Sequence, residues 1–228
     1  MKEILTEKYR MQELAGLNPV QVWFDLDGVL ANMQGALDSN EELAKLRAVV
    51  DGIIDSTLPR YKGLSNDLLR KKFKEELIED PNNEDVKALK KAFKVYNNMV
   101  FKIAARDGFY ADLELMEGAE NMIRAAHAIT GVKPNILSAP VGNENDPNNP
   151  AVIEKRAWVK NYFGDLVNEV QITLNKPRVI RSEKDLLIDD REKYVNSFIE
   201  GGGSAILHKN SVDTIKKLEQ MVQHLSSN

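Results

Sequence analysis

The chain has 228 residues, of which 43% are hydrophobic and 29% charged, with a formal net charge of −4 and no cysteine. This length allows one main core and an accessory subdomain. The absence of cysteine excludes disulfides, thiolate metal sites and cysteine nucleophiles, and it fits a reducing compartment. No apolar run is long enough to span a bilayer, and residues 1–8 mix both charges, unlike a signal peptide. We therefore expect a cytoplasmic protein with no membrane partner.

Residues 2–16 carry apolar side chains at helical spacing, which predicts a short amphipathic helix ended by Gly16. The apolar, aromatic run over about 20–26 then predicts the first strand. That strand ends in Asp25-Leu26-Asp27-Gly28, so two carboxylates lie at the mouth of a buried strand. Such a pair is costly unless a positive charge compensates it. The pattern favours a divalent cation and phosphoryl transfer through an aspartyl phosphate.

Residues 33–106 differ in composition from the rest, because they are rich in Leu, Lys, Glu and Ala and show helical spacing. Ser39 and Glu42 form a capping-box pattern at the start of the first of these helices. So much helix after one strand exceeds a simple crossover connection, which indicates a separate helical cap. We expect helices at 39–50, 65–79 and 84–104, with a loop at 55–59.

After the cap, helical and strand patterns alternate, which predicts an α/β fold: a Rossmann-like parallel sheet with helices on both faces. We expect strands at 133–137, 169–173, 185–188 and 205–208 and helices at 118–130, 150–163, 191–200 and 211–225. The predicted domains are a catalytic core of residues 1–32 and 107–228, and the inserted cap of residues 33–106. Ligands of such sheets bind beyond the carboxyl ends of the strands, where Asp25 and Asp27 fall.

Polar residues also follow two later strands. Ser138 ends one strand, and its hydroxyl group and neighbouring N–H groups could bind phosphate oxygens, although a serine that merely starts a turn fits equally well. Lys176 lies just beyond another strand and would neutralise a transferring phosphoryl group. Lys155, on the helix that follows Ser138, is a second candidate for that role.

A second pair of acids, Asp189-Asp190, ends the apolar run at 186–188. Mg²⁺ prefers one or two carboxylates together with waters and phosphate oxygens, and Asp25 with Asp189 would supply that number. Asp190 could instead cap the following helix, or serve both purposes.

Together these residues resemble the four motifs of the haloacid dehalogenase-like (HAD) phosphohydrolase superfamily, over about residues 20–210. The resemblance implies that Asp25 is the nucleophile and that Asp27 is the general acid and base. It also implies that Asp25, Asp189 and the Asp27 backbone carbonyl hold Mg²⁺. In this hypothesis Ser138 and Lys176 offset phosphoryl charge, Asp190 orients Lys176 or a metal-bound water, and Gly28 leaves room for the phosphate.

Secondary motifs resemble the 5′(3′)-deoxyribonucleotidase family more narrowly. They are Asp27-Gly28-Val29-Leu30-Ala31, Asp107 to Leu113, Met116-Glu117-Gly118-Ala119, Glu154 to Val159 and Leu186 to Asp190. The resemblance implies a phosphomonoesterase that acts on (deoxy)nucleoside monophosphates, with a homodimer as the expected assembly. The chain departs from the family at Asn32 and Met33, at Ala139, and at Leu174-Asn175, so the substrate-facing set is not fully kept.

Candidate substrate-binding residues are Phe109 and Tyr110, which could stack on a base or simply pack in the core, together with Met33, Ala139 and Lys155. Two alternatives keep the fold and change the function. One is a phosphatase for a sugar phosphate or a nucleic-acid terminal phosphate, although the acidic balance and the lack of a basic stripe argue against a polynucleotide. The other is a binding protein without turnover.

Overall fold

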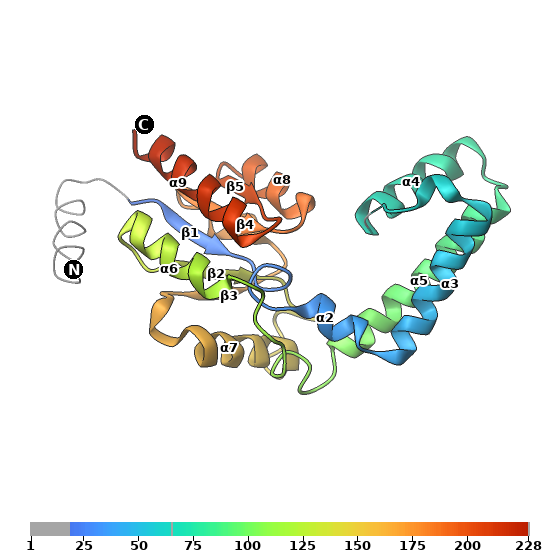
Figure 1. Cartoon of the computed structure of the whole chain (residues 1–228), viewed down its shortest axis with the longest axis horizontal. Coiled ribbons are helices and arrows are strands. Elements are labelled where there is room, and N and C mark those ends of the chain that lie inside the picture. Colours follow the sequence, from blue (N-terminus) through green and yellow to red (C-terminus); the bar gives the residue numbers. More distant parts are fainter. Residues whose placement is uncertain (1–18, 65, 228) are drawn as a thin grey trace. The chain divides into compact units, whose positions relative to one another are not determined.

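The computed structural model describes residues 19–64 and 66–227, so the helix expected at 2–16 lies outside the described residues. Within the described part, five parallel strands form one sheet in the order β3-β2-β1-β4-β5 (Figure 1). The strands are β1 (Gln21–Phe24), β2 (Asn135–Ser138), β3 (Val170–Ile172), β4 (Asp185–Asp189) and β5 (Ser204–Leu207). The chain runs outward from β1 to β3 and then crosses to β4, so the strand order reverses between β1 and β4.

Helices flank this sheet, which confirms the expected α/β class (Figure 1). They are α6 (Ala119–Thr130), α7 (Pro150–Phe163), α8 (Glu192–Glu200) and α9 (Ser211–Ser227), with short 3₁₀ turns η2 (Gly164–Leu166) and η3 (Lys176–Val179). The predicted helix at 150–163 is confirmed to the residue, because Asn149 caps its first turn and Gly164 follows its last residue. No helix in the described residues is both long and apolar enough to cross a membrane.

One cluster of the core is built from side chains on three neighbouring strands. Trp23, Leu137 and Leu187 come from β1, β2 and β4 and pack with Phe198 of α8. The Trp23 indole N–H donates to Asp185 Oδ1 at 3.0 Å, so the one polar atom of that ring is satisfied. This packing fixes the centre of the sheet, from which the polar strand ends project.

The chain divides into two compact units, one with residues up to Gln34 and from Asp107 onward, and one with Gly35–Arg106. The helical segment contains α2 (Met33–Asp38), α3 (Glu41–Thr57), η1 (Pro59–Tyr61), α4 (Asn66–Glu79) and α5 (Glu84–Ala104). Helices α3 and α5 lie side by side (Figure 1). Tyr61, Phe73 and Phe93 form a chain of ring contacts, at centroid distances of 6.0 and 5.6 Å, that holds this unit together.

The start and end of α3 differ from the prediction. The cap is Asn40, whose side chain accepts from the Leu43 N–H at 3.1 Å, whereas the Ser39 hydroxyl donates back to Ala36 O. The helix also continues through the expected loop at 55–59 as far as Thr57. Because the hydroxyls of residues 56 and 57 bond to carbonyls one turn earlier, these polar residues are satisfied inside the helix, and Pro59 ends it.

The chain segments that leave and re-enter the sheet unit are bonded to each other. Asn32 N donates to Glu114 O and Met116 N donates to Leu30 O, both at 2.8 Å. This antiparallel pairing brings together residues more than 80 positions apart in the chain. The helical unit is therefore inserted through a short two-stranded neck directly after β1.

We expect Phe198→Ala to lower the free energy of unfolding by about 3–5 kcal/mol, because it removes a ring that is fully buried against three strands. Urea unfolding followed by circular dichroism measures the change. Ile199→Ala is the matched control, since its side chain is 51% exposed. Equal losses in the two variants would contradict the packing described here.

Candidate active site

Four polar side chains from separate strands meet at the carboxyl edge of the sheet. Asp25 follows β1, Ser138 ends β2, Lys176 follows β3 and Asp189 ends β4. All four are buried, with Ser138, Lys176 and Asp189 fully so. Because β1 and β4 flank the reversal of strand order, Asp25 and Asp189 lie at the position where sheets of this kind bind ligands.

The Lys176 ammonium bridges two of these acids. Its Nζ lies 2.7 Å from Asp25 Oδ1 and also contacts Asp189 Oδ2. Burial by itself would lower the pKa of Lys176, but the charges of Asp25 and Asp189 outweigh it and raise that pKa. The lysine therefore stays charged, and Asp25 and Asp189 orient it. The predicted role of Asp190, to orient Lys176 or a metal-bound water, stays a prediction.

A second lysine, Lys155 of α7, holds the other acid of the first motif. Its Nζ lies 2.6 Å from Asp27 Oδ2, 3.0 Å from Ser138 Oγ and 2.7 Å from Ala139 O. Burial raises the pKa of Asp27 against the lowering effect of Lys155. The second oxygen, Asp27 Oδ1, is buried and accepts no hydrogen bond from the described residues. One oxygen of this carboxyl group is thus fixed by Lys155, while the other has no hydrogen-bond partner among the described residues.

Gly28 lies at the tight turn after the first motif. Its φ of +79° is a conformation that favours glycine, and a Cβ here would lie 2.5 Å from Asp190 Oδ2. The residue therefore brings the turn against the second acid pair. Any side chain at position 28 would push Asp190 away from Asp25 and Asp189.

Three carboxylates lie close enough to hold one cation. An oxygen from each of Asp25, Asp189 and Asp190 lies within 4.8 Å of the other two. Burial and the charge of Asp25 raise the pKa of Asp189 to about 6. Partial desolvation and the charges of Asp25 and Asp189 raise the pKa of Asp190 to about 7. Three acids against Lys176 leave a charge of −2, which matches a divalent cation with oxygen ligands.

The sequence had paired Asp25 and Asp189 with Asp27 as metal-binding residues. In the structure Asp190 is the third carboxylate of the cluster, and the Asp27 side chain is held by Lys155 instead. A contribution from the Asp27 backbone carbonyl stays a prediction. The residues present fit a divalent ion in charge and in donor type, and the identity of that ion belongs to the proposal below.

Glu154 is a residue of this region that the sequence did not single out. Its Oε1 accepts from the Gly108 N–H at 2.6 Å and its Oε2 accepts from the Tyr110 N–H at 3.0 Å. It therefore anchors the segment where the chain returns to the sheet unit, one residue before Lys155. The signal was present in the motif Glu154-Lys155, but a helix-period pattern does not reveal which backbone a carboxylate will bind.

The candidate substrate-binding residues differ in how exposed their side chains are. Tyr110 is 1% exposed, and its ring packs 4.5 Å from Lys155 Nζ, so the structure favours packing over stacking on a base. Phe109 is half-buried and makes an edge contact with Tyr110 at 5.1 Å. Met33 and Ala139 are also half-buried. Of this set, Lys155 and Ala139 reach the acids directly or through one hydrogen bond.

Comparisons with known proteins give structural neighbours only. Neither a protein-family model nor a curated protein sequence matches the chain. Similar solved structures include a HAD-superfamily hydrolase from Ehrlichia chaffeensis, with 15% identity, a TM-score of 0.46 and coverage of 90% of this chain and 98% of that one. L-2-haloacid dehalogenase from Xanthobacter autotrophicus has 14% identity, a TM-score of 0.44 and coverage of 91% and 88%.

A third neighbour is a HAD family hydrolase from Deinococcus radiodurans R1 with bound phosphate and sodium. It has 17% identity, a TM-score of 0.38 and coverage of 87% of both chains. These structural neighbours are HAD-superfamily hydrolases, and they include a dehalogenase. At these identities and scores, the chemistry of this chain has to be argued from its own site.

We expect Asp190→Asn to stabilise the protein in chelator, and more so as the pH rises. The folded state keeps protons on Asp189 and Asp190 up to a pH of about 6 and about 7, whereas the unfolded chain releases them near about pH 4. Between these pH values the folded state binds more protons than the unfolded chain, so the free energy of unfolding falls as the pH rises. Removing one acid removes part of that fall. Thermal unfolding between pH 4 and pH 8 tests this.

The exposed Asp165→Asn provides the control for this pH series. A gain in Tm for Asp190→Asn that is the same at every pH would contradict the charge cluster. A gain confined to high pH, and reduced when a divalent cation is added, would support it.

We expect Glu154→Gln to free the return segment locally. The amide side chain can accept through only one oxygen and carries no charge, so one of the two backbone N–H groups loses its partner, at a cost of about 1–3 kcal/mol. Hydrogen exchange at the amides of Gly108 and Tyr110 is the measurement, with the neighbouring Ile153→Gln as control because Ile153 is 53% exposed. Unchanged exchange at both amides would show that Glu154 does not anchor this segment.

Proposed function

We propose that the protein is a Mg²⁺-dependent phosphomonoesterase that hydrolyses (deoxy)nucleoside monophosphates through an aspartyl phosphate. One observation carries the chemistry. Two acids, two residues apart, are each held by a different buried lysine, Asp25 by Lys176 and Asp27 by Lys155. This gives a nucleophile and an acid–base group separate environments at one strand end.

Asp25 is the proposed nucleophile. The Lys176 ammonium lies 2.7 Å from Asp25 Oδ1, and the backbone N–H of Asp25 donates to Ile188 O at 2.8 Å. Both the side chain and the backbone of Asp25 are therefore positioned. The free carboxylate oxygen attacks phosphorus in line, and the bond from phosphorus to the ester oxygen breaks. The product of this step is the phosphorylated Asp25 and an alkoxide that requires a proton.

Asp27 supplies that proton in this scheme. Its raised pKa favours the protonated acid, and Oδ1 has no partner among the described residues to compete with the leaving group. Once the alcohol has left, the carboxylate takes a proton from a water that attacks the aspartyl phosphate. Phosphate is released, Asp25 is restored, and Asp27 is protonated for the next cycle.

The remaining site residues balance charge on the phosphoryl group. Lys155 also donates to Ser138 Oγ, so the serine hydroxyl keeps its own proton for a phosphoryl oxygen. Lys176 stabilises the charge that develops around Asp25. A divalent ion held by Asp25, Asp189 and Asp190, when bound, would act as a Lewis acid toward the phosphate oxygens.

The nucleotide part of the proposal is supported by the sequence motifs that resemble the 5′(3′)-deoxyribonucleotidase family. Of the two aromatic candidates, Phe109 is half-buried and keeps accessible surface for a base, whereas Tyr110 is buried. We extend the proposal to a cytoplasmic enzyme that acts on small nucleotides as a homodimer. The role of the helical segment as a cap stays a prediction.

Asp25→Asn is expected to reduce turnover by at least about 10³-fold without unfolding the protein, since an amide is a poor nucleophile. The assay is phosphate release from nucleoside 5′- and 3′-monophosphates and an aryl phosphate, with Mg²⁺ and with chelator. Asp165→Asn, exposed and remote from the motifs, is the control. Turnover in Asp25→Asn at the wild-type rate would remove the nucleophile assignment.

The same panel separates the alternatives. Metal-dependent release that favours deoxynucleotides supports the full proposal, whereas activity on the aryl ester or a sugar phosphate alone keeps the phosphatase and rejects the nucleotide. Chloride release from 2-chloropropionate would replace phosphoryl transfer with dehalogenation. No turnover of any substrate would favour a binding protein with this fold.

A further inference from the structure

A groove lies within the helical unit and shares no residue with the acid–lysine pairs described above. It has a volume of about 550 Å³ and runs between α4 and α5. It is lined by Arg70, Phe73, Lys74, Leu77, Ile78, Lys90, Phe93, Lys94, Asn97 and Asn98. None of these residues takes part in the proposed reaction, so the groove is unexplained by it.

The floor of the groove is apolar. Phe73 and Phe93 meet edge to face at a centroid distance of 5.6 Å and are each 3% exposed, so they form a rigid base. Leu77 is half-buried, and Ile78 is 70% exposed at the side. Because the two rings are already buried, the apolar surface that a ligand would remove from water is that of Leu77 and Ile78, and this removal favours binding of an apolar group.

The rim of the groove is cationic and contains no acid. Lys74, Lys90 and Lys94 are exposed, and no described carboxylate pairs with them. Arg70 is already placed, with its guanidinium 5.7 Å from the Phe93 ring centroid and a hydrogen bond to Asn97 Oδ1 at 3.1 Å. Three exposed lysines around one apolar floor, in a chain of net charge −4, form a local field of the opposite sign.

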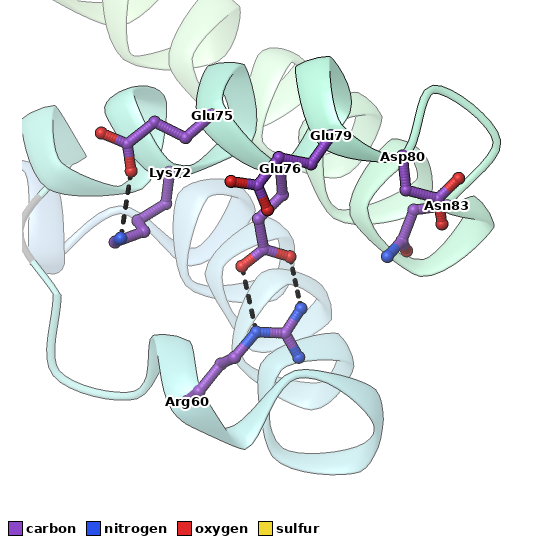
Figure 2. Close-up of a pocket in the computed structure, with 7 residues that line it drawn as sticks. All are labelled: Arg60, Lys72, Glu75, Glu76, Glu79, Asp80 and Asn83. Atoms are coloured by element: carbon purple, nitrogen blue, oxygen red, sulfur yellow. Dashed lines mark hydrogen bonds and ion pairs between the residues drawn. The ribbon is translucent and has the colours of Figure 1, made fainter.

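Three acids of α4, Glu75, Glu76 and Glu79, lie on its opposite face. Figure 2 shows a second groove, of about 310 Å³, in which Glu76 is paired with Arg60 and Glu75 with Lys72. Residues 72, 75, 76 and 79 recur at helical spacing, as do residues 70, 74, 77 and 78, and at about 100° per residue the two sets point in opposite directions. These three acids are thus kept away from the cationic rim.

We propose that the α4–α5 groove binds a small amphipathic anion, with an aromatic or acyl body on the phenylalanine floor and a phosphate or carboxylate group at the lysines. The volume falls in the range of small-molecule sites, which is roughly 300–1,000 Å³. Ten lining residues are fewer than the roughly 20–30 that a stable protein interface engages on each side. The exposed amide of Asn98 adds donors for the same head group, whereas the Asn97 amide already donates to Phe93 O.

Calorimetric titration of the full chain in chelator tests this directly. The probes are decyl phosphate, decanoate, decyltrimethylammonium and inorganic phosphate, each below its micelle concentration. We expect both anionic amphiphiles to bind, and the cation and inorganic phosphate to bind at least tenfold more weakly. The tighter of the two anions identifies the head group. Equal binding of cation and anions, or no binding of either anion, would overturn the proposal.

Two pairs of matched variants locate the site. Lys90→Glu with Lys94→Glu should weaken decyl phosphate at least tenfold, whereas Lys91→Glu with Lys102→Glu makes the same charge change on exposed positions of α5 outside the groove. Ile78→Asp should also weaken it at least tenfold, against Val95→Asp, which is 48% exposed and does not line the groove. Far-UV circular dichroism verifies that each variant is folded.

Equal losses of affinity in the groove and control variants would show that decyl phosphate binds outside the groove, for example at the proposed active site, and would overturn the proposal. Binding is measured without turnover. Binding of the anions without hydrolysis of any substrate would therefore support this inference and contradict the proposed function. Hydrolysis without binding of the anions would support the proposed function and contradict this inference.

Discussion

A buried lysine between two buried acids is the interaction on which the arrangement of side chains at the carboxyl edge of the sheet depends. Parallel pairing of β1 with β4 places Phe24 opposite Ile188, so the next residues along, Asp25 and Asp189, emerge side by side. Two such carboxylates would repel each other at low dielectric, and the Lys176 ammonium between them offsets that cost. The surplus charge left by Asp190 then creates the demand for a divalent ion.

The α7 helix links this edge to the rest of the sheet unit through three of its residues. Lys155 reaches Asp27, while Glu154 binds two backbone N–H groups of the returning chain and Trp158 donates to Leu113 O at 2.7 Å. One helix therefore positions an acid of the site and anchors the segment that comes back from the helical unit. A displacement of that segment would change the packing around Lys155, because the Tyr110 ring lies against the Lys155 ammonium.

The sequence predicted the parts of the fold that rest on simple periodicity. Strand ends with polar residues, and α7 with its Asn and Gly boundaries, follow from alternation and capping, and the structure has them. It did not predict that α3 would continue to Thr57. The hydroxyl groups of residues 56 and 57 donate to backbone carbonyls one turn earlier in the same helix, and composition does not reveal these bonds. Nor did it predict Glu154 or the place of Asp190 in the carboxylate cluster, since both depend on contacts between distant segments.

The separation of Asp25 from Asp27 is what makes two roles available to chemically identical side chains. They leave the strand on either side of Leu26, which is itself buried, so the two carboxyl groups reach different lysines. Asp25 is held in an ion pair beside Asp189, whereas Asp27 has a raised pKa and one oxygen without a partner among the described residues. A nucleophile requires the charged form and a general acid requires the proton. Because two lysines on different elements supply these environments, exchanging either lysine should disturb one role more than the other.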